Sequence, residues 1–121
     1  KLNKYDCTEV YSSWAERCCV EPDVADRVFV AEVGENIVGF RAIRMNSPDQ
    51  GEMLLAAVQP DARNKGIYTS FVIKALNWSR DEGAKEVITS TLIFNFGVLK
   101  ACVRLGFEPY EAYHTFHKWF D

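Results

Sequence analysis

VQPDARNKGIY, residues 58–68, is the stretch of this chain that decides its fold. An apolar segment that we expect to form a buried strand ends at Val58, and a segment with helical periodicity begins at Gly66. The first turn of a helix has backbone N–H groups without intrahelical partners, and the helix dipole adds about half a positive charge there. Gly66 allows a bound group to approach the backbone closely, while Arg63 and Lys65 add positive charge beside it. The stretch therefore predicts a strand–loop–helix unit with a site for an anion.

Taken alone, this loop is weak evidence for a binding site. An ordinary strand–loop–helix connection with solvated basic residues would have the same composition. The loop matches neither the G-x-x-x-x-G-K-[ST] pattern of P-loop proteins nor the glycine pattern of dinucleotide-binding proteins. Its significance therefore depends on the elements around it.

Upstream of the loop, the residue pattern predicts one helix and three strands. Runs of β-branched and aromatic residues indicate strands, and the short turn Gly34–Asn36 makes the first two strands a hairpin. The third strand is almost entirely apolar from Met53 to Val58, which is typical of a central strand buried on both faces. The expected elements are a helix over Glu9–Val20 capped by Thr8, strands over Arg27–Val33, Asn36–Met45 and Glu52–Val58, and a loop over Asn46–Gly51.

Downstream of the loop, helices alternate with strands. Apolar side chains form one stripe along the first of these helices, which Gly83 helps to end, and Gly106 ends the second. A three-strand meander followed by strands joined through helices predicts an α/β domain with a mixed sheet. The expected elements are helices over Gly66–Asp81 and Asn95–Leu105, a strand over Glu86–Thr91, and a final antiparallel pair over Phe107–Tyr110 and Tyr113–Trp119.

Composition narrows the class of protein. The 121 residues fit a single domain over residues 1–121. A net charge of −3 argues against nucleic-acid binding, and no apolar run approaches the roughly 20 residues that span a bilayer, so we expect no membrane partner. The four cysteines have no C-x-x-C spacing and are too few for a disulfide scaffold. We therefore expect no metal, free thiols and a cytoplasmic location.

With these elements in place, the loop resembles a known one. A strand, then Val-x-Pro-x-x-Arg-x-x-Gly-Ile over residues 58–67, then a helix, is similar to the pyrophosphate loop of GNAT-type N-acetyltransferases. Asn95, eleven residues before Gly106–Phe107, resembles the second half of that family's pattern. Over residues 27–120 the resemblance implies the GNAT acyl-CoA acyltransferase fold. In that fold a central, twisted, mostly antiparallel sheet is flanked by helices and splays between the family's fourth and fifth strands.

The same resemblance implies where acetyl-CoA binds. Backbone groups at the end of the central strand would pair with the pantetheine arm, N–H groups of the loop would hold the pyrophosphate, and the later Asn would reach the pantetheine. The acceptor amine would attack the thioester directly, without an acyl-enzyme. The implied cofactor-binding residues are Ala56, Ala57, Val58, Arg63, Asn64, Lys65, Gly66, Ile67, Tyr68 and Asn95.

The chain departs from the family pattern at two positions. Many relatives have a Tyr, the acid for the leaving thiolate, where this chain has Cys102, and a small residue where it has Tyr68. Cys102 is thus a candidate acid or, alternatively, a small buried residue. In the second case Tyr68, Tyr110 or Tyr113 could act as the acid in its place. A bulky Tyr68 side chain must also point away from the phosphates, or the cofactor shifts.

A base is needed to take the proton of the acceptor amine. Glu52, at the start of the central strand, is the candidate that the resemblance favours, acting through water; the alternative is a solvated strand-end residue. Glu32 is the second option.

Two further pairs of residues have imidazole or charged side chains. His114 and His117 are three residues apart in a predicted strand, so they point to opposite faces and do not form a metal pair. Arg41 and Arg44 also fall on opposite faces. Both arginines are expected at a solvated strand edge, although one of them could meet an anionic acceptor.

The resemblance implies an acetyl-CoA-dependent N-acetyltransferase for the primary amine of a small molecule. The tail, Arg104–Pro109 and then Tyr113–Trp119, is similar to transferases of bacterial surface-polysaccharide loci, whose relatives acetylate dTDP-linked amino sugars. A nucleotide-linked amino sugar is therefore the favoured acceptor. The alternatives are a protein or antibiotic amine, and a GNAT module that binds acyl-CoA without turnover. Because the family usually begins with one more strand and helix, we expect a short or N-terminally truncated domain. A homodimer through Tyr113–Trp119 could complete its acceptor site.

Overall fold

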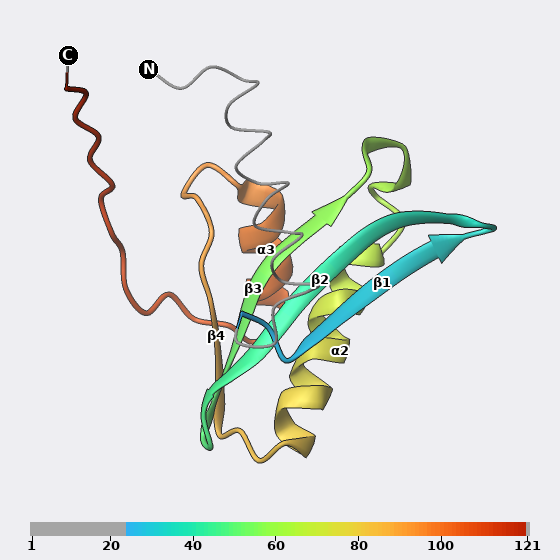
Figure 1. Ribbon diagram of the computed structural model, residues 1–121, viewed down its shortest axis with the longest axis horizontal. Coiled ribbons are helices and arrows are strands. Elements are labelled where there is room, and N and C mark those ends of the chain that lie inside the picture. The colour runs from blue at the N-terminus through green and yellow to red at the C-terminus, as the bar shows by residue number, and fades with distance from the viewer. Residues whose placement is uncertain (1–23, 121) are drawn as a thin grey trace.

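The computed structural model describes residues 24–120, and all elements named below lie in that range (Figure 1). The predicted helix over Glu9–Val20 lies outside the described residues. Element labels follow Figure 1. The elements are β1 (Arg27–Val33), β2 (Asn36–Ser47), β3 (Gln50–Val58), the short 3₁₀ helix η1 (Pro60–Ala62), α2 (Ile67–Asp81), β4 (Glu86–Thr89) and α3 (Phe96–Arg104).

The strands form one mixed sheet in the order β1-β2-β3-β4. β1 pairs with β2 and β2 with β3 in antiparallel fashion, whereas β4 runs parallel to β3 after the α2 crossover. The predicted meander, the interior position of the third strand and the mixed α/β fold are thus confirmed. In Figure 1, α2 and α3 lie on one side of this sheet.

The β2–β3 hairpin is tighter than predicted, because both strands extend into the expected loop over Asn46–Gly51. Ser47 pairs with Gln50, and the Ser47 hydroxyl accepts hydrogen bonds from the backbone N–H groups of Asp49 (3.3 Å) and Gln50 (3.1 Å). These bonds close the turn around Pro48. Polar residues can extend a strand in this way when their side chains face water, so polarity alone misplaced the strand ends.

The main core lies between the sheet and α2. Ile43 from β2 and Met53 from β3 pack against Val72 and Ala75 of α2, and all four are almost fully buried. A smaller cluster on the opposite face contains Ala42 and the partly buried Leu54. Alternation along β2 and β3 therefore separates an α2 face, which carries Ile43 and Met53, from an opposite face.

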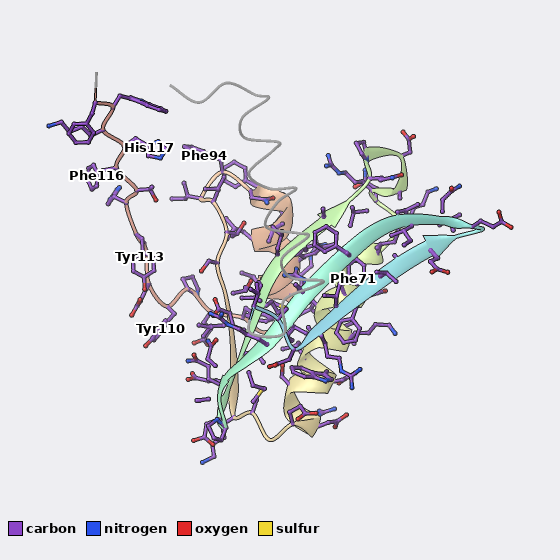
Figure 2. All side chains as sticks on the ribbon, in the orientation of Figure 1. Phe71, Phe94, Tyr110, Tyr113, Phe116 and His117 are labelled. Carbon is purple, nitrogen blue, oxygen red and sulfur yellow. The ribbon has the colours of Figure 1, made fainter. Side chains whose placement is uncertain are left out.

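The predicted strands over Phe107–Tyr110 and Tyr113–Trp119 are wrong. Residues 107–120 form neither helix nor strand, and Figure 1 shows this tail running away from the sheet. Its aromatic side chains are exposed, and Figure 2 shows Tyr110, Tyr113 and Phe116 projecting from it. Strand propensity reflects packing on a neighbouring surface. The tail has no neighbouring strand among the described residues, so its aromatic sequence does not produce a ladder.

Candidate functional site

The loop between β3 and α2 is held by a few local hydrogen bonds. After η1, the backbone N–H of Arg63 donates to the carbonyl of Pro60 (3.3 Å), and Arg63 Nε donates to the carbonyl of Val58 (3.2 Å). Asn64 has φ 64° and Gly66 has φ 77°, so two left-handed residues turn the chain into α2. The Arg63 side chain thus anchors the loop to the end of β3 and leaves its own guanidinium exposed.

The N-terminus of α2 presents unused N–H groups. The Ser70 N–H donates to the Gly66 carbonyl (3.0 Å) as the first helical bond, so the N–H groups of Ile67, Tyr68 and Thr69 precede it. No side chain of residues 24–120 caps this terminus, and its first turn has no acidic residue. A Cβ built on Gly66 would meet nothing within 4 Å, so the approach is open. The geometry fits an anion, as the sequence predicts.

The sheet opens beside this loop. β3 pairs with β4 only from Gln50 to Met53, and Thr89 Oγ1 donates to the Met53 carbonyl (3.3 Å) at the last pair. Beyond that point, residues 54–58 of β3 have no partner on this side within the part of the chain described. The sheet therefore splays between β3 and β4, as expected.

A bulge lies at the same place. Ile43 of β2 pairs with Met53, but Arg41 pairs with Ala56, so three steps along β3 match two along β2. Bulges twist a strand and disturb its ladder, and they often lie next to functional sites. The three β3 residues expected to pair with pantetheine, Ala56, Ala57 and Val58, pair with β2 on one side but have no pairing with β4 on the other.

Asn95 lies at the start of α3, six residues after the end of β4. Its Oδ1 accepts a hydrogen bond from the backbone N–H of Val98 (3.3 Å), which makes Asn95 the N-cap. The cap uses only the oxygen of the amide, so the Nδ2 donors are not used by it. The side chain is exposed.

Glu52 lies in a polar network on the sheet face opposite α2. Its Oε1 accepts hydrogen bonds from Arg44 Nη2 (3.2 Å) and Asn46 Nδ2 (2.9 Å), and the network continues through Gln50 to Glu86. The Glu52 side chain is 22% exposed. It is therefore neither free nor fully solvated: it is an ion-paired carboxylate one residue before Met53, the last residue of β3 that pairs with β4.

Arg41 corrects an expectation. The sequence predicted a solvated strand edge for it, yet Arg41 is 2% exposed and lies on the α2 face. Its guanidinium carbon is 5.1 Å from the centre of the Tyr68 ring. Its position within the apolar run Val38–Ile43, two residues from Ile43, was the signal for burial.

Tyr68 and Cys102, the two departures from the family pattern, are neighbours. Burial raises the pKa of Tyr68 above its ordinary value of 10.0, the Arg41 charge lowers it, and Cys102 raises it. Cys102 on α3 is 6% exposed. The Tyr68 side chain packs on the core and therefore lies on the inner side of the loop.

The remaining candidates lie elsewhere. Glu32 is exposed on β1, and His114, His117 and the tail tyrosines are exposed in the segment after α3. None of them joins the group formed by the loop, the open edge of β3 and Tyr68. Among residues 24–120, no helix is long and apolar enough to cross a membrane, and no group of His, Cys, Asp and Glu is arranged to hold a metal.

The sequence matches the Acetyltransferase (GNAT) family over residues 3–107. The chain belongs to this family. The GNAT chain is 29% identical over 85 residues to the mycothiol acetyltransferase of Corynebacterium glutamicum (strain R). The aligned region covers 70% of this chain and 29% of that protein. It is 27% identical over 117 residues to N-acetyltransferase 8B of Rattus norvegicus, with 84% of this chain and 53% of that protein covered.

A solved structure has the same GNAT fold. The aminoglycoside N-acetyltransferase AAC(6')-Iy in complex with CoA superposes with a TM-score of 0.67 at 20% identity, covering 98% of this chain and 97% of that one. At this identity the likeness shows the fold. The chain spans about a third to a half of the length of the two curated relatives.

Proposed function

We propose that this chain is an acetyl-CoA-dependent N-acetyltransferase that transfers an acetyl group directly to the primary amine of a small molecule. The observation that carries the proposal is the uncapped N-terminus of α2 beside the open edge of β3. The helix terminus is a site for an anion, which matches a pyrophosphate. The backbone groups along the open edge of β3 match an arm that contains amides. Family membership supports the same substrate.

Acetyl-CoA would use both features. The N–H groups from Arg63 to Tyr68, with the charges of Arg63 and Lys65, would hold the pyrophosphate. Backbone groups of Ala56–Val58 would pair with the pantetheine arm as an added strand does. The Nδ2 donors of Asn95 would reach that arm from α3. The residues fit this role because Gly66 faces open space and no side chain of the described residues caps the helix.

The reaction needs groups on both sides of the thioester. The amine nitrogen forms a bond to the carbonyl carbon, the C–S bond breaks, and the amine loses a proton. We assign the proton acceptor to Glu52, acting through water, because it lies one residue before Met53, where pairing with β4 ends and the sheet opens.

Cys102 was the sequence candidate for the acid. Its burial supports a packing role instead, although a thiol can donate a proton.

The acceptor is proposed as an amino sugar, with a nucleotide-linked one favoured by the resemblance of the tail. Sugars also feature in the similar proteins, one named a mycothiol acetyltransferase and one an aminoglycoside N-acetyltransferase. An antibiotic amine, a protein amine or an acyl-CoA-binding module without turnover are the alternatives. The cytoplasmic location belongs to the same proposal, supported by the free thiol of Cys102.

Two measurements test the proposal. Acetyl-CoA should raise the melting temperature, because a ligand held at about 100 times its Kd stabilises the folded state by about 2.7 kcal/mol. The protein should then release CoA, followed as free thiol, when it is given its acceptor from a panel of amines. The panel contains dTDP-amino sugars, aminoglycosides, a cysteinyl amino sugar and peptides. Stabilisation without release for any amine would favour the binding module, and no stabilisation would contradict the proposal.

A homodimer is also proposed. The exposed aromatic side chains of the tail and the outer edge of β4, which pairs with β3 alone within residues 24–120, are surfaces that a second copy could cover. Its test belongs to the scale of the whole molecule and is given in the Discussion.

A further inference from the structure

Arg41 is a buried cation without a matching anion in the described part of the chain. Two of its nitrogens, Nε and Nη2, are buried and have no hydrogen-bond partner there. The ion pairs found among residues 24–120 join other residues, Arg44 to Glu52 and Lys85 to Asp49. Burying an unpaired charge costs several kcal/mol. A buried, unpaired arginine lowers the stability of the fold. We therefore expect it at a place where a negative charge forms nearby during function.

The group best placed to become negative is Tyr68. The Arg41 guanidinium lies under its ring, and both Arg41 from β2 and Cys102 from α3 act on its pKa. The core cluster against which Tyr68 packs is apolar and is formed by Ile43, Met53, Val72 and Ala75. A phenol is protonated at neutral pH, and burial raises the pKa of Tyr68 further, so Tyr68 holds a proton next to a cation that would stabilise the phenolate.

The cluster lies beside the opening of the sheet. Arg41 is the register partner of Ala56, in the part of β3 that β4 leaves free, and Tyr68 is in the first turn of α2. Glu52, on the opposite face, lies one residue before Met53, the last residue of β3 that pairs with β4. A thioester lying in the opening would therefore have a carboxylate on one face of the sheet and a phenol on the other.

We propose that Tyr68 is the proton donor to the leaving thiolate and that Arg41 positions it and stabilises the phenolate formed in that step. The proposal rests on the proposed function. As the C–S bond breaks, its electron pair goes to sulfur, and the sulfur takes the phenol proton. The phenolate is then reprotonated from solvent, which has received the proton of the amine. The sum is one amide and one free thiol, with no oxidant or reductant needed.

The decisive variant is Tyr68→Phe, which keeps the ring and removes only the hydroxyl. Turnover should fall by about 10²-fold, the lower end of the contribution of general acid catalysis, while stabilisation by acetyl-CoA and KM stay unchanged. The alkaline limb of the pH–kcat profile should disappear with the hydroxyl. Tyr110→Phe, on the exposed tail, is the matched control and should match the wild type.

Arg41→Met tests the positioning role. Removing a buried unpaired charge should leave stability unchanged or raise it, so loss of folding does not confuse the result. Since Arg41 lowers the pKa of Tyr68, its removal should move the alkaline limb of the profile to higher pH and reduce kcat. A purely structural role would not move this limb.

The double variant Tyr68→Ala/Cys102→Tyr puts the phenol on the neighbouring helix, in the space that Tyr68 leaves. It should turn over faster than Tyr68→Ala alone. Unchanged kcat in Tyr68→Phe overturns the assignment, and so does a loss of acetyl-CoA binding equal to the loss of turnover. A wild-type chain that neither binds acetyl-CoA nor releases CoA overturns the proposed function itself.

Discussion

Tyr68 shows how a single side chain can change the chemistry of a loop. Two residues earlier, Gly66 faces open space, whereas Tyr68 turns onto the core and contacts groups from two other elements. A small residue here would leave the buried Arg41 guanidinium without its aromatic neighbour. The bulky residue is therefore compatible with an anion on the outer side of the loop, because its side chain occupies the inner side.

The pH dependence of stability should report on Tyr68. Its raised pKa means that the folded chain holds the phenol proton more tightly than the unfolded chain. This stabilising contribution is present below the ordinary pKa of 10.0 and disappears as the pH rises through the folded value. Between pH 8 and pH 11 the wild type should therefore lose more stability than Tyr68→Phe, measured by urea unfolding.

Tyr113→Phe is the control for that experiment. Its pKa is also raised, by a hydrogen bond to Glu111, but Tyr113 is exposed and solvent screens the effect. Its removal should leave the alkaline loss of stability nearly as in the wild type. An alkaline loss in Tyr68→Phe equal to that of the wild type would contradict the burial of the phenol.

Glu52→Gln tests the base at the residue scale. The amide keeps the shape and can still accept from Arg44, but it cannot take a proton, so kcat should fall by about 10²-fold or more. The melting-temperature increase with acetyl-CoA should stay. Glu86→Gln, at the other end of the same polar network, is the control and should keep wild-type turnover. Equal turnover in the two variants would remove Glu52 from the mechanism.

At the element scale, β1 and α2 were predicted most accurately, and the predicted strand over Arg27–Val33 has the same bounds as β1. The predicted helix differs from the observed one by a single residue at its start, and Gly66 proves to be the N-cap. A continuous apolar stripe and the glycines at both ends explain this accuracy. The ends of β2, β3 and β4 were predicted less well, because a strand ends where its partner ends, and the partner is distant in sequence.

A charge at the start of α2 should act on stability and binding in opposite directions. Thr69→Asp adds an acid to the first turn, which should stabilise the helix by about 0.3–1 kcal/mol through its dipole. The same charge should repel the pyrophosphate and reduce the affinity for acetyl-CoA. Thermal melting with and without the ligand measures both effects.

Asn77→Asp is the matched control for this charge, since it lies about 12 Å further along the helix at 1.5 Å per residue. It should leave acetyl-CoA affinity close to that of the wild type. Tighter binding in Thr69→Asp, or an equal loss in both variants, would argue against an anion site at this terminus.

The contact of α2 with β3 should tolerate no added atom at Gly51. A Cβ there would lie 2.6 Å from Ser79 Oγ and 3.0 Å from Ser79 Cβ. Gly51→Ala should therefore destabilise the chain by about 1–3 kcal/mol, as overpacking does. Gly97→Ala, where a Cβ meets nothing within 4 Å, should leave the free energy of unfolding unchanged or raise it. A neutral Gly51→Ala would mean that α2 sits further from the sheet.

At the scale of the whole molecule, the tail is the feature that most needs a partner. Tyr110, Tyr113 and Phe116 are each more than three-quarters exposed, as Figure 2 shows. Large exposed apolar surfaces often mark interaction sites. We expect a dimer by light scattering at micromolar concentration, and a shift to monomer when the three residues are replaced together by Ser. A wild-type monomer at all concentrations would contradict the dimer.

The sequence by itself determined the order of the elements from β1 to α3, the α2 helix and the loop that we propose as an anion site, because these depend on periodicity, caps and glycines within a few residues. Tertiary structure alone decided the rest. The opening between β3 and β4, the burial of Arg41 and the meeting of Tyr68 with Cys102 join residues that are far apart in the chain. The tail failed to form strands for the same reason. Pairing and burial depend on which surfaces meet, and a local pattern of residues carries no information about a partner that is absent from it.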